Sequence, residues 1–310
     1  MIDRAILGKT ELSVSRLGFG AAPIGFLETE QSQVAKLLGF FLDHGVNLID
    51  TAACYAGSEQ AIGRAIAGRR DDAILVTKAG HASGLDTPDF DPKTIEASID
   101  RSLERLQTDH VDVVLLHSCE LDVLKRGDAL GAAVKAREAG KTRFVGYSGD
   151  NQAAAYAAGL PDVAVVETSV NICDQHNIAE VLPACAEHDV GVIAKRPLAN
   201  AAWKKPDQQR GGYADYAAPY RERLGKMKVK PMDLGYSGHV ELEWPEIALK
   251  FTLAIPGVHT AIVGTTHQTN AEANLAAVEK NPLREQAVQR LRQAFDRAQE
   301  DAGEPWPGLQ

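Results

Sequence analysis

The sequence lacks paired cysteines. Its four cysteines, at positions 54, 119, 173 and 185, form no Cys-x-x-Cys motif, and no histidine lies at zinc-finger spacing from them. A disulfide scaffold and a zinc module are therefore not indicated. No His-Glu-x-x-His motif or cluster of carboxylates occurs either, so the sequence predicts no metal site. We expect reduced thiols in a cytoplasmic protein.

Long apolar runs and a surplus of basic residues are also missing. The longest apolar stretches, such as residues 113–116, are too short to span a bilayer, and the first residues lead into no apolar signal segment. Lys and Arg total 33 against 42 Asp and Glu, a net charge of −9. Because nucleic acids and anionic membranes attract basic surfaces, neither is expected as a partner.

The chain does have a globular composition and a regular alternation of patterns. Apolar residues make up 45% and charged residues 24% of its 310 positions, as in proteins whose core needs no crosslink. Segments of helical period, such as the one carrying Ile95, Ile99 and Leu103, alternate with short β-branched runs. Eight of these runs are predicted strands: residues 17–21, 46–50, 74–78, 111–117, 143–148, 163–168, 190–195 and 259–264.

Eight strand–helix units in one chain predict the α/β class and a (β/α)8 barrel, with residues 1–310 forming a single domain. A doubly wound open sheet is the alternative, and it needs a glycine-rich phosphate fingerprint after its first strand. Gly18 and Gly20 begin such a fingerprint, but Pro23 stands where the third glycine must pack against a helix. The sequence therefore favours the barrel.

One connection is much longer than the others. Residues 203–243 follow the seventh predicted strand, are rich in Gly, Lys, Tyr and Pro, and lack a clean period. A connection of this length is usually functional or disordered, so we expect a substrate loop here. Its Tyr213, Tyr216, Tyr220 and Arg221 would suit a sugar, although a solvated surface loop fits equally well. Residues 283–310 are expected to form a final helix and tail.

Four reactive side chains stand at the ends of three consecutive predicted strands: Asp50, Tyr55, Lys78 and His117. Strand carboxyl ends meet at one mouth in a barrel. Each residue alone could be structural, but together they describe an acid for carbonyl reduction. Asp50 would pair with Lys78, the lysine would lower the pKa of Tyr55, and a neutral His117 would donate a hydrogen bond to the substrate carbonyl.

The surrounding motifs resemble those of the aldo-keto reductase superfamily over nearly the whole chain. They are residues 45–52 with Tyr55 and Gly57-Ser58-Glu59, then Thr77-Lys78, Leu115-Leu116-His117, Gly140-Lys141-Thr142-Arg143 and Arg196-Pro197-Leu198. The resemblance implies a (β/α)8 barrel that binds a nicotinamide cofactor without a Rossmann fold. It also implies that Tyr55 is the general acid or base, that Lys78 tunes it, and that His117 orients the carbonyl.

The resemblance further implies a set of cofactor contacts at the barrel mouth. Ser148 matches the position that holds the carboxamide. The remaining matched positions are Gly20, Gly149, Glu167 and Lys195 at strand ends, Pro197, Leu198, Ala199 and Asn200 near the pyrophosphate, and Gly264, Thr265, Thr266, Asn270 and Asn274 near the adenosine phosphate.

Three of these positions depart from the pattern of the superfamily. Gly149 replaces an asparagine, Glu167 replaces an amide-bearing glutamine, and Lys195 replaces the aromatic residue that stacks on the nicotinamide. Because the sixth and seventh strands are neighbours, we expect Glu167 and Lys195 to form an ion pair beside the cofactor. Two independent solvated charges are the alternative.

The predicted function is an NAD(P)-dependent oxidoreductase that interconverts a small carbonyl or sugar with its alcohol. NADP is expected, with NAD as the alternative because no Lys or Arg occurs between positions 251 and 279 to hold a 2′-phosphate. A cofactor-sensing binding subunit and a lyase that uses Lys78 as a Schiff-base amine are alternative functions. The substrate, the direction of reaction and homo-oligomer formation stay open.

Overall fold

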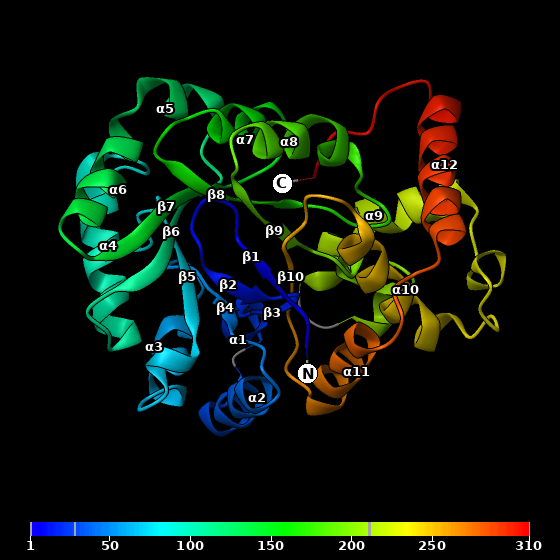
Figure 1. Ribbon diagram of the computed structural model, residues 1–310, viewed down its shortest axis with the longest axis horizontal. Coiled ribbons are helices and arrows are strands. Elements are labelled where there is room, and N and C mark those ends of the chain that lie inside the picture. Colours follow the sequence, from blue (N-terminus) through cyan, green and yellow to red (C-terminus); the bar gives the residue numbers. More distant parts are fainter. Residues whose placement is uncertain (1, 28, 210–211, 310) are drawn as a thin grey trace.

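The computed structural model describes residues 2–27, 29–209 and 212–309, and its centre is a closed barrel of parallel strands (Figure 1). Around the barrel the strand order is β10-β3-β4-β5-β6-β7-β8-β9. Within the described residues, eight strands form it: β3 (Leu17–Gly20), β4 (Leu48–Asp50), β5 (Ile74–Ala79), β6 (Val111–His117), β7 (Thr142–Ser148), β8 (Val163–Ser169), β9 (Gly191–Lys195) and β10 (Thr260–Val263). Each coincides with one of the predicted runs, so the predicted (β/α)8 barrel is confirmed.

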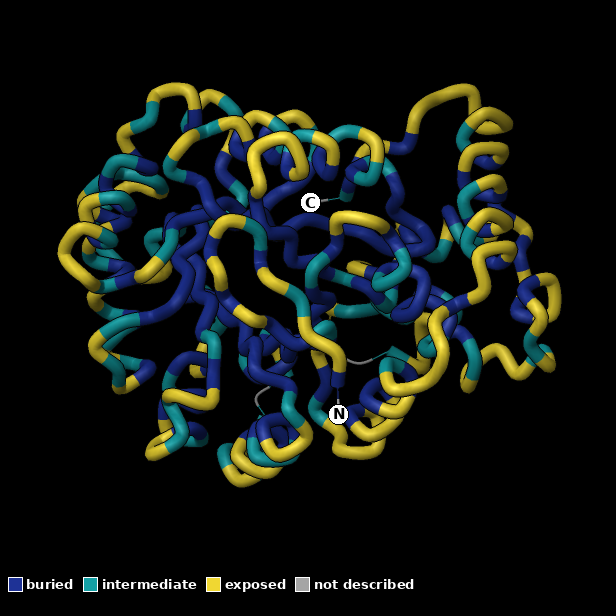
Figure 2. Tube along the Cα trace, viewed as in Figure 1, coloured by how far each residue is buried: buried dark blue, intermediate teal, exposed yellow. Residues whose placement is uncertain are grey.

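Helices surround the barrel, and along them buried residues alternate with exposed ones (Figure 2). In α4, Asp91 caps the first turn by accepting a 2.9 Å hydrogen bond from the Lys93 N–H, and Ile95 and Ile99 are buried. The described helices are α1 (Ala22–Phe26), α2 (Gln31–Asp43), α3 (Ser58–Ala65), α4 (Pro92–Leu106), α5 (Leu121–Arg126), α6 (Asp128–Glu138), α7 (Asn151–Ala158), α8 (His176–Glu187), α9 (Tyr213–Met227), α10 (Val240–Ala254), α11 (Gln268–Glu279) and α12 (Glu285–Ala302).

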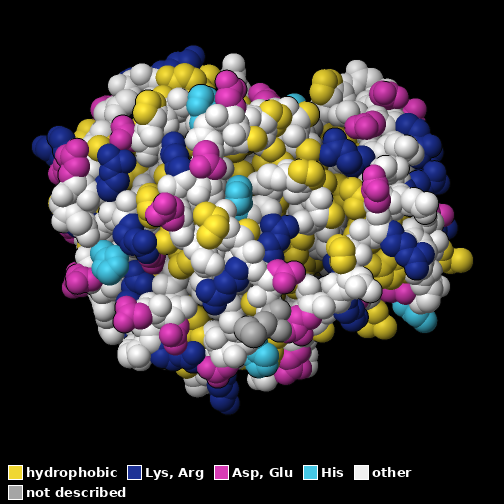
Figure 3. Space-filling model, viewed as in Figure 1, with side chains coloured by type: hydrophobic (Ala, Val, Ile, Leu, Met, Phe, Trp, Pro, Cys, Tyr) yellow, Lys and Arg dark blue, Asp and Glu magenta, His cyan; other side chains and the backbone are white. Residues whose placement is uncertain are grey.

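The surface is mixed in charge. Figure 3 shows Lys and Arg side chains interspersed with Asp and Glu over the face in view. Among the described residues, none of the helices is both long enough and apolar enough to cross a bilayer.

An amino-terminal hairpin closes one end of the barrel, and the sequence did not predict it. Strands β1 (Arg4–Ile6) and β2 (Ser13–Ser15) pair antiparallel. Leu7, Leu12 and Val14 from the hairpin are buried in one cluster with apolar side chains from inside the barrel. Strands of three residues are too short to give an alternating pattern that sequence analysis can detect.

The long connection after β9 contains a helix, α9, in a segment that has no clean helical period. Helix α9 has 15 residues and includes Pro219 and Gly225, two residues that disfavour helix interiors. It packs against α12 and buries Tyr220 and Met227, so tertiary contacts rather than propensity support it. Helices α9 and α12 lie side by side at the right of Figure 1.

The strands change character at their carboxyl ends. Successive inward-facing residues on a strand are two positions apart. On several strands an apolar inward residue is followed, two positions later, by a polar one. The barrel interior therefore has an apolar layer toward its amino-terminal end and, above it, a layer of polar side chains at the base of the mouth, which we call the polar floor. The pairs are Leu48 and Asp50, Val76 and Lys78, Leu115 and His117, Val165 and Glu167, and Ile193 and Lys195.

Candidate active site

A buried ion pair between Asp50 and Lys78 forms the centre of the polar floor. The Lys78 ammonium lies 2.5 Å from Asp50 Oδ1 and donates a second hydrogen bond to the Thr51 carbonyl at 3.0 Å. Both side chains are at most 3% exposed. The structure therefore contains the Asp50–Lys78 pair that the sequence predicted. Both groups are buried so deeply that either charge without its partner would cost several kcal/mol in stability.

Tyr55 and His117 lie above this pair and face each other. The Lys78 ammonium is 5.5 Å from the centre of the Tyr55 ring, and the Tyr55 and His117 rings meet edge to face at 6.0 Å. His117 Nδ1 lies 3.5 Å from Cys54 Sγ. Four side chains from β4, the loop after it, β5 and β6 thus come together at one mouth, as the sequence predicted.

Burial decides the protonation of Tyr55 and His117. Burial raises the pKa of Tyr55, and the opposing effect of Lys78 does not cancel it. Lys78 does act to lower the pKa of this phenol, as predicted, but desolvation of the phenolate outweighs attraction to the ammonium. Burial also lowers the pKa of His117 well below its usual value, with Lys78 and His81 adding to the effect. Near neutral pH the site holds a protonated phenol and a neutral imidazole.

Glu167 contacts Lys78, which the sequence did not predict. Its Oε2 lies 3.3 Å from the Lys78 ammonium, and its Oε1 accepts a 3.2 Å hydrogen bond from Ser148 Oγ. Burial, followed by repulsion from Glu167, raises the pKa of Asp50 well above its usual value even though Lys78 opposes both. Burial acts to lower the pKa of Lys78, but attraction to Asp50 and Glu167 outweighs it and raises that pKa.

Lys195 pairs with Asp150, so the predicted Glu167–Lys195 pair is wrong. The Lys195 ammonium lies 3.0 Å from Asp150 Oδ2. Asp150 Oδ1 also accepts hydrogen bonds from the Ser169 N–H at 2.7 Å and from Asn177 Nδ2 at 2.8 Å. In the β8–β9 register Glu167 is opposite Ile193, whereas Lys195 is opposite Ser169. The two side chains are staggered by two residues, and each has a nearer partner.

Gly149 is explained by its neighbour Tyr147. A Cβ added at Gly149 would lie 2.4 Å from the Tyr147 hydroxyl oxygen. That hydroxyl donates a 2.8 Å hydrogen bond to the Cys119 carbonyl, so the ring is fixed in place. An asparagine at position 149 would collide with it, and the departure from the usual pattern follows from this packing.

The other predicted cofactor positions lie around the same mouth. Gly20 ends β3, Pro197 to Asn200 follow β9, and Gly264 to Thr266 connect β10 to α11, which carries Asn270 and a buried Asn274. A mouth floored by Ser148 and Glu167, with Glu167 Oε2 buried and accepting no hydrogen bond, offers polar partners for an amide-bearing ring. The first turn of α11 offers backbone N–H groups to a phosphate. The residues present therefore fit a nicotinamide dinucleotide.

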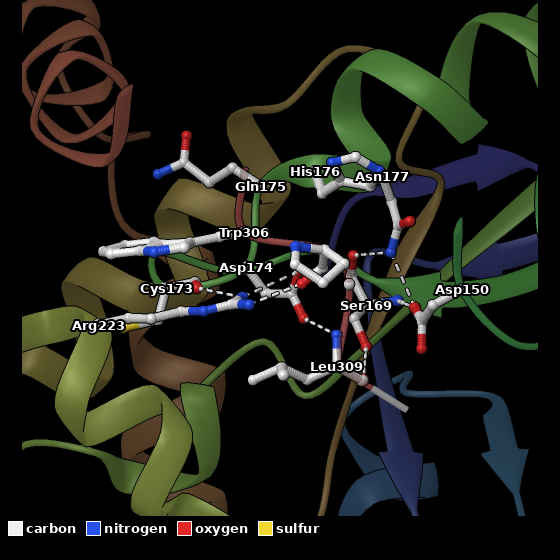
Figure 4. Close-up of polar contacts among 12 residues, drawn as sticks. Asp150, Ser169, Cys173, Asp174, Gln175, His176, Asn177, Arg223, Trp306 and Leu309 are labelled. Carbon is white, nitrogen blue, oxygen red and sulfur yellow. Dashed lines mark hydrogen bonds and ion pairs between the residues drawn. The ribbon is translucent and has the colours of Figure 1, made fainter. Parts of the chain in front are cut away.

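The segment after α12 folds back onto the mouth, through contacts that no local sequence pattern specified (Figure 4). The Leu309 N–H donates to Asp174 Oδ2 at 3.0 Å, and Arg223 donates to the Pro307 carbonyl at 2.7 Å. Arg196, at the end of β9, donates to the Leu309 carbonyl. We call residues 306–309 the tail strap.

Buried groups hold the tail strap. Trp306 is buried, stacks above the Arg223 guanidinium at 5.3 Å and meets Phe295 of α12 edge to face at 5.2 Å. Asp174 is fully buried, and burial raises its pKa to about 6, against the N–H of Leu309 and the charge of Arg223. A lone tryptophan between prolines near the end of a polar helix was the available sequence signal.

No cluster of three or more His, Cys, Asp or Glu side chains suited to a metal ion occurs within residues 2–27, 29–209 and 212–309. Charged floor residues are instead satisfied by one another, as in the two pairs Asp50–Lys78 and Asp150–Lys195.

Comparison with known proteins agrees with this geometry. A sequence model of the Aldo/keto reductase family matches residues 16–296. The chain is 30% identical to an L-galactose dehydrogenase of Arabidopsis thaliana over 296 residues, covering 89% of this chain and 88% of the relative. It is 29% identical to a D-threo-aldose 1-dehydrogenase of a Pseudomonas species, covering 86% and 91%. The solved structure of aldo-keto reductase AKR11C1 from Bacillus halodurans, in its holo form, superposes with a TM-score of 0.79 at 28% identity, covering 95% of this chain and 96% of the other.

Proposed function

Because the chain belongs to the aldo-keto reductase family and is an NAD(P)H-dependent oxidoreductase, we propose that Tyr55 is the proton donor and acceptor for its carbonyl–alcohol interconversion. The observation that carries the proposal is the juxtaposition of Tyr55, His117 and the buried Lys78–Asp50 pair at one mouth. Asp50, Tyr55, Lys78 and His117 form the proposed catalytic tetrad.

The protonation states support reduction of a carbonyl. A nicotinamide, when bound, supplies the hydride to the carbonyl carbon. Tyr55, protonated near neutral pH, gives its proton to the carbonyl oxygen, and Lys78 stabilises the phenolate that forms. Neutral His117 donates a hydrogen bond to the same oxygen and fixes its direction. In alcohol oxidation the same phenolate takes the proton back.

For the cofactor we propose NADP, with NAD as a live alternative. Ser148 and Glu167 would hold the carboxamide end, and the loops at Pro197–Asn200 and Gly264–Thr266 would hold the phosphates together with the first turn of α11. A 2′-phosphate needs cations, and the segment from residue 251 to 279 contains none. We therefore propose weak discrimination between the two nucleotides.

For the substrate we propose an aldose or another hydroxy-carbonyl compound. Phe26 of α1 is 60% exposed and meets the Tyr55 ring at 5.4 Å and the Tyr213 ring of α9 at 6.5 Å. An exposed aromatic face beside the proton donor can stack on the C–H face of a sugar. The two relatives named above as an L-galactose dehydrogenase and a D-threo-aldose 1-dehydrogenase act on sugars by name, which supports the same class.

A panel of aldehydes, ketones and sugars, assayed with NADPH and NADH and with the oxidised forms, tests the proposal. We expect nucleotide oxidation by carbonyls and nucleotide reduction by at least one aldose. Single-turnover mixing of the NADPH-bound protein with reactive aldehydes separates an enzyme from a cofactor-sensing subunit. Tight nucleotide binding with no oxidation of the bound nucleotide would refute the proposed activity.

A further inference from the structure

At the Lys78 end of the floor, two carboxylates face one ammonium group. Lys78 faces both Asp50, at 2.5 Å, and Glu167, at 3.3 Å. All three side chains are at most 3% exposed, so solvent screens them weakly. The adjacent pair, Lys195 with Asp150, is balanced. The surplus negative charge therefore belongs to the cluster of Lys78 with its two carboxylates.

Within that cluster, Glu167 is the carboxylate that belongs to the cofactor side. Asp50 is on β4 and pairs with Lys78, whereas Glu167 is on β8 and its Oε1 accepts a 3.2 Å hydrogen bond from Ser148 of β7. Its Oε2 accepts no hydrogen bond.

A nicotinamide ring that exchanges hydride with a carbonyl held by Tyr55 and His117 must lie against the polar floor of the same mouth. The tetrad uses the side chains of β4 to β6, and the floor that remains is formed by Ser148, Glu167 and Lys195. An oxidised nicotinamide ring carries a positive charge, whereas the reduced ring carries none. A buried carboxylate therefore attracts the oxidised ring, whereas the reduced ring carries no net charge for it to attract.

We propose that Glu167 is a specificity-determining residue for the redox state of the cofactor: its carboxylate strengthens binding of the oxidised nucleotide relative to the reduced one and so shifts the equilibrium on the protein toward carbonyl reduction. This inference rests on the proposed function. By linkage, tighter binding of the oxidised nucleotide favours the side of the bound equilibrium that contains it, which is oxidised nucleotide with alcohol.

The test measures dissociation constants of NADP⁺ and NADPH by titration calorimetry for the wild-type protein, Glu167→Gln and a control variant, Glu59→Gln. Glutamine keeps the shape of Glu167 and removes its charge. We expect Glu167→Gln to weaken NADP⁺ binding by about tenfold and NADPH binding by less than about threefold, the scale of one buried charge near the ring.

Glu59 is a matched control because it is also a buried carboxylate, 1% exposed, but it lies on α3 outside the barrel. It accepts a 2.7 Å hydrogen bond from Thr77 and pairs with Arg105 at 3.3 Å. Glu59→Gln should leave the ratio of the two dissociation constants within about twofold of the wild type, since the charge it removes is paired and separated from the mouth by the strand.

Three outcomes are informative. If Glu167→Gln weakens both nucleotides equally, Glu167 has a structural or hydrogen-bonding role and the inference is overturned. If that variant does not fold, Glu167→Asp keeps the charge and withdraws it by one methylene, and an unchanged ratio for Glu167→Asp overturns the inference as well. If the wild-type protein binds neither nucleotide, the proposed function fails instead.

Discussion

The two halves of the barrel mouth differ in how they satisfy their charges. On the β4–β6 half, Asp50 and Lys78 pair with each other beside Tyr55, and Lys78 also faces Glu167 of β8. On the β7–β9 half, Asp150 is held by Lys195, by the Ser169 N–H and by Asn177, and the tail strap is anchored nearby on Arg196 and Asp174. The first half contains the proposed proton donor, and the second half is held together by contacts between residues far apart in the sequence.

Removing Lys195 should break the second half most severely. Lys195→Met leaves Asp150 buried without its cation, and we expect a loss of about 3–5 kcal/mol in the free energy of unfolding. In the background of Asp150→Asn the same substitution should cost much less. Urea denaturation of the four proteins gives the coupling energy.

The control for this double-mutant cycle is the pair of Glu167 and Lys195, which the sequence suggested. Lys195→Met and Glu167→Gln should be additive within about 0.5 kcal/mol, because each residue has a different partner. Strong coupling of Lys195 to Glu167 and none to Asp150 would contradict the structure's pairing.

Replacing Tyr55 should break the first half without disturbing the second. Tyr55→Phe removes the phenolic proton and leaves the ring in place. We expect kcat to fall by at least about 100-fold, the usual size for a general acid, while the dissociation constant for NADPH changes little. Steady-state kinetics with an aldehyde, together with a nucleotide titration, checks both parts. Comparable turnover by the variant would remove Tyr55 from its proposed role.

The preference between NADPH and NADH tests whether the second half of the mouth can bind a 2′-phosphate. Since residues 251–279 contain no Lys or Arg, the ratio of kcat/KM for NADPH to that for NADH should stay below about 100, or about 2.7 kcal/mol. Parallel assays with one substrate and both nucleotides measure it. A larger ratio would mean that cations from another segment contact the 2′-phosphate.

The smallest effect is expected at the anchor of the tail strap. Asp174 has a pKa of about 6 in the folded protein, above the value of about 4 for an unfolded chain, so the folded state binds a proton more readily. Wild-type stability should therefore rise by about 1 kcal/mol from this residue as pH falls from 7 to 5. Asp174→Asn keeps an acceptor for the Leu309 N–H and carries no titrating group.

The measurement is the difference in unfolding free energy between Asp174→Asn and the wild type at pH 7 and at pH 5. The variant's relative stability should decrease at the lower pH, because only the wild type gains there. A difference that does not depend on pH would show that Asp174 is ionised in the same way in both states.

Sequence patterns sufficed for the barrel and for the first half of its mouth. Alternation along each strand places Asp50 and Lys78 inward one step above Leu48 and Val76, and neighbouring strands then bring the two charges together. Each step depends on residues that are close in sequence or on adjacent strands.

The second half could not be predicted in the same way. Glu167 reaches Lys78 on β5, which is three strands away around the barrel, across its narrow interior. Strand adjacency says nothing about such a contact, and it suggested Lys195 instead. The bond from Leu309 to Asp174 joins residues 135 positions apart, and no local pattern encodes it. Helix α9 was missed for the related reason that packing, not propensity, supports it.

The hairpin of β1 and β2 has a consequence for the traffic of small molecules. Leu7, Leu12 and Val14 fill the amino-terminal end of the barrel, so a molecule that reaches Tyr55 enters from the opposite face. Nucleotide and substrate must then both enter through the open, carboxyl-terminal end of the barrel. The molecule that binds deeper in the mouth has to bind first and leave last. Closure of the other end by the hairpin therefore imposes an order of binding, and product-inhibition kinetics can measure that order.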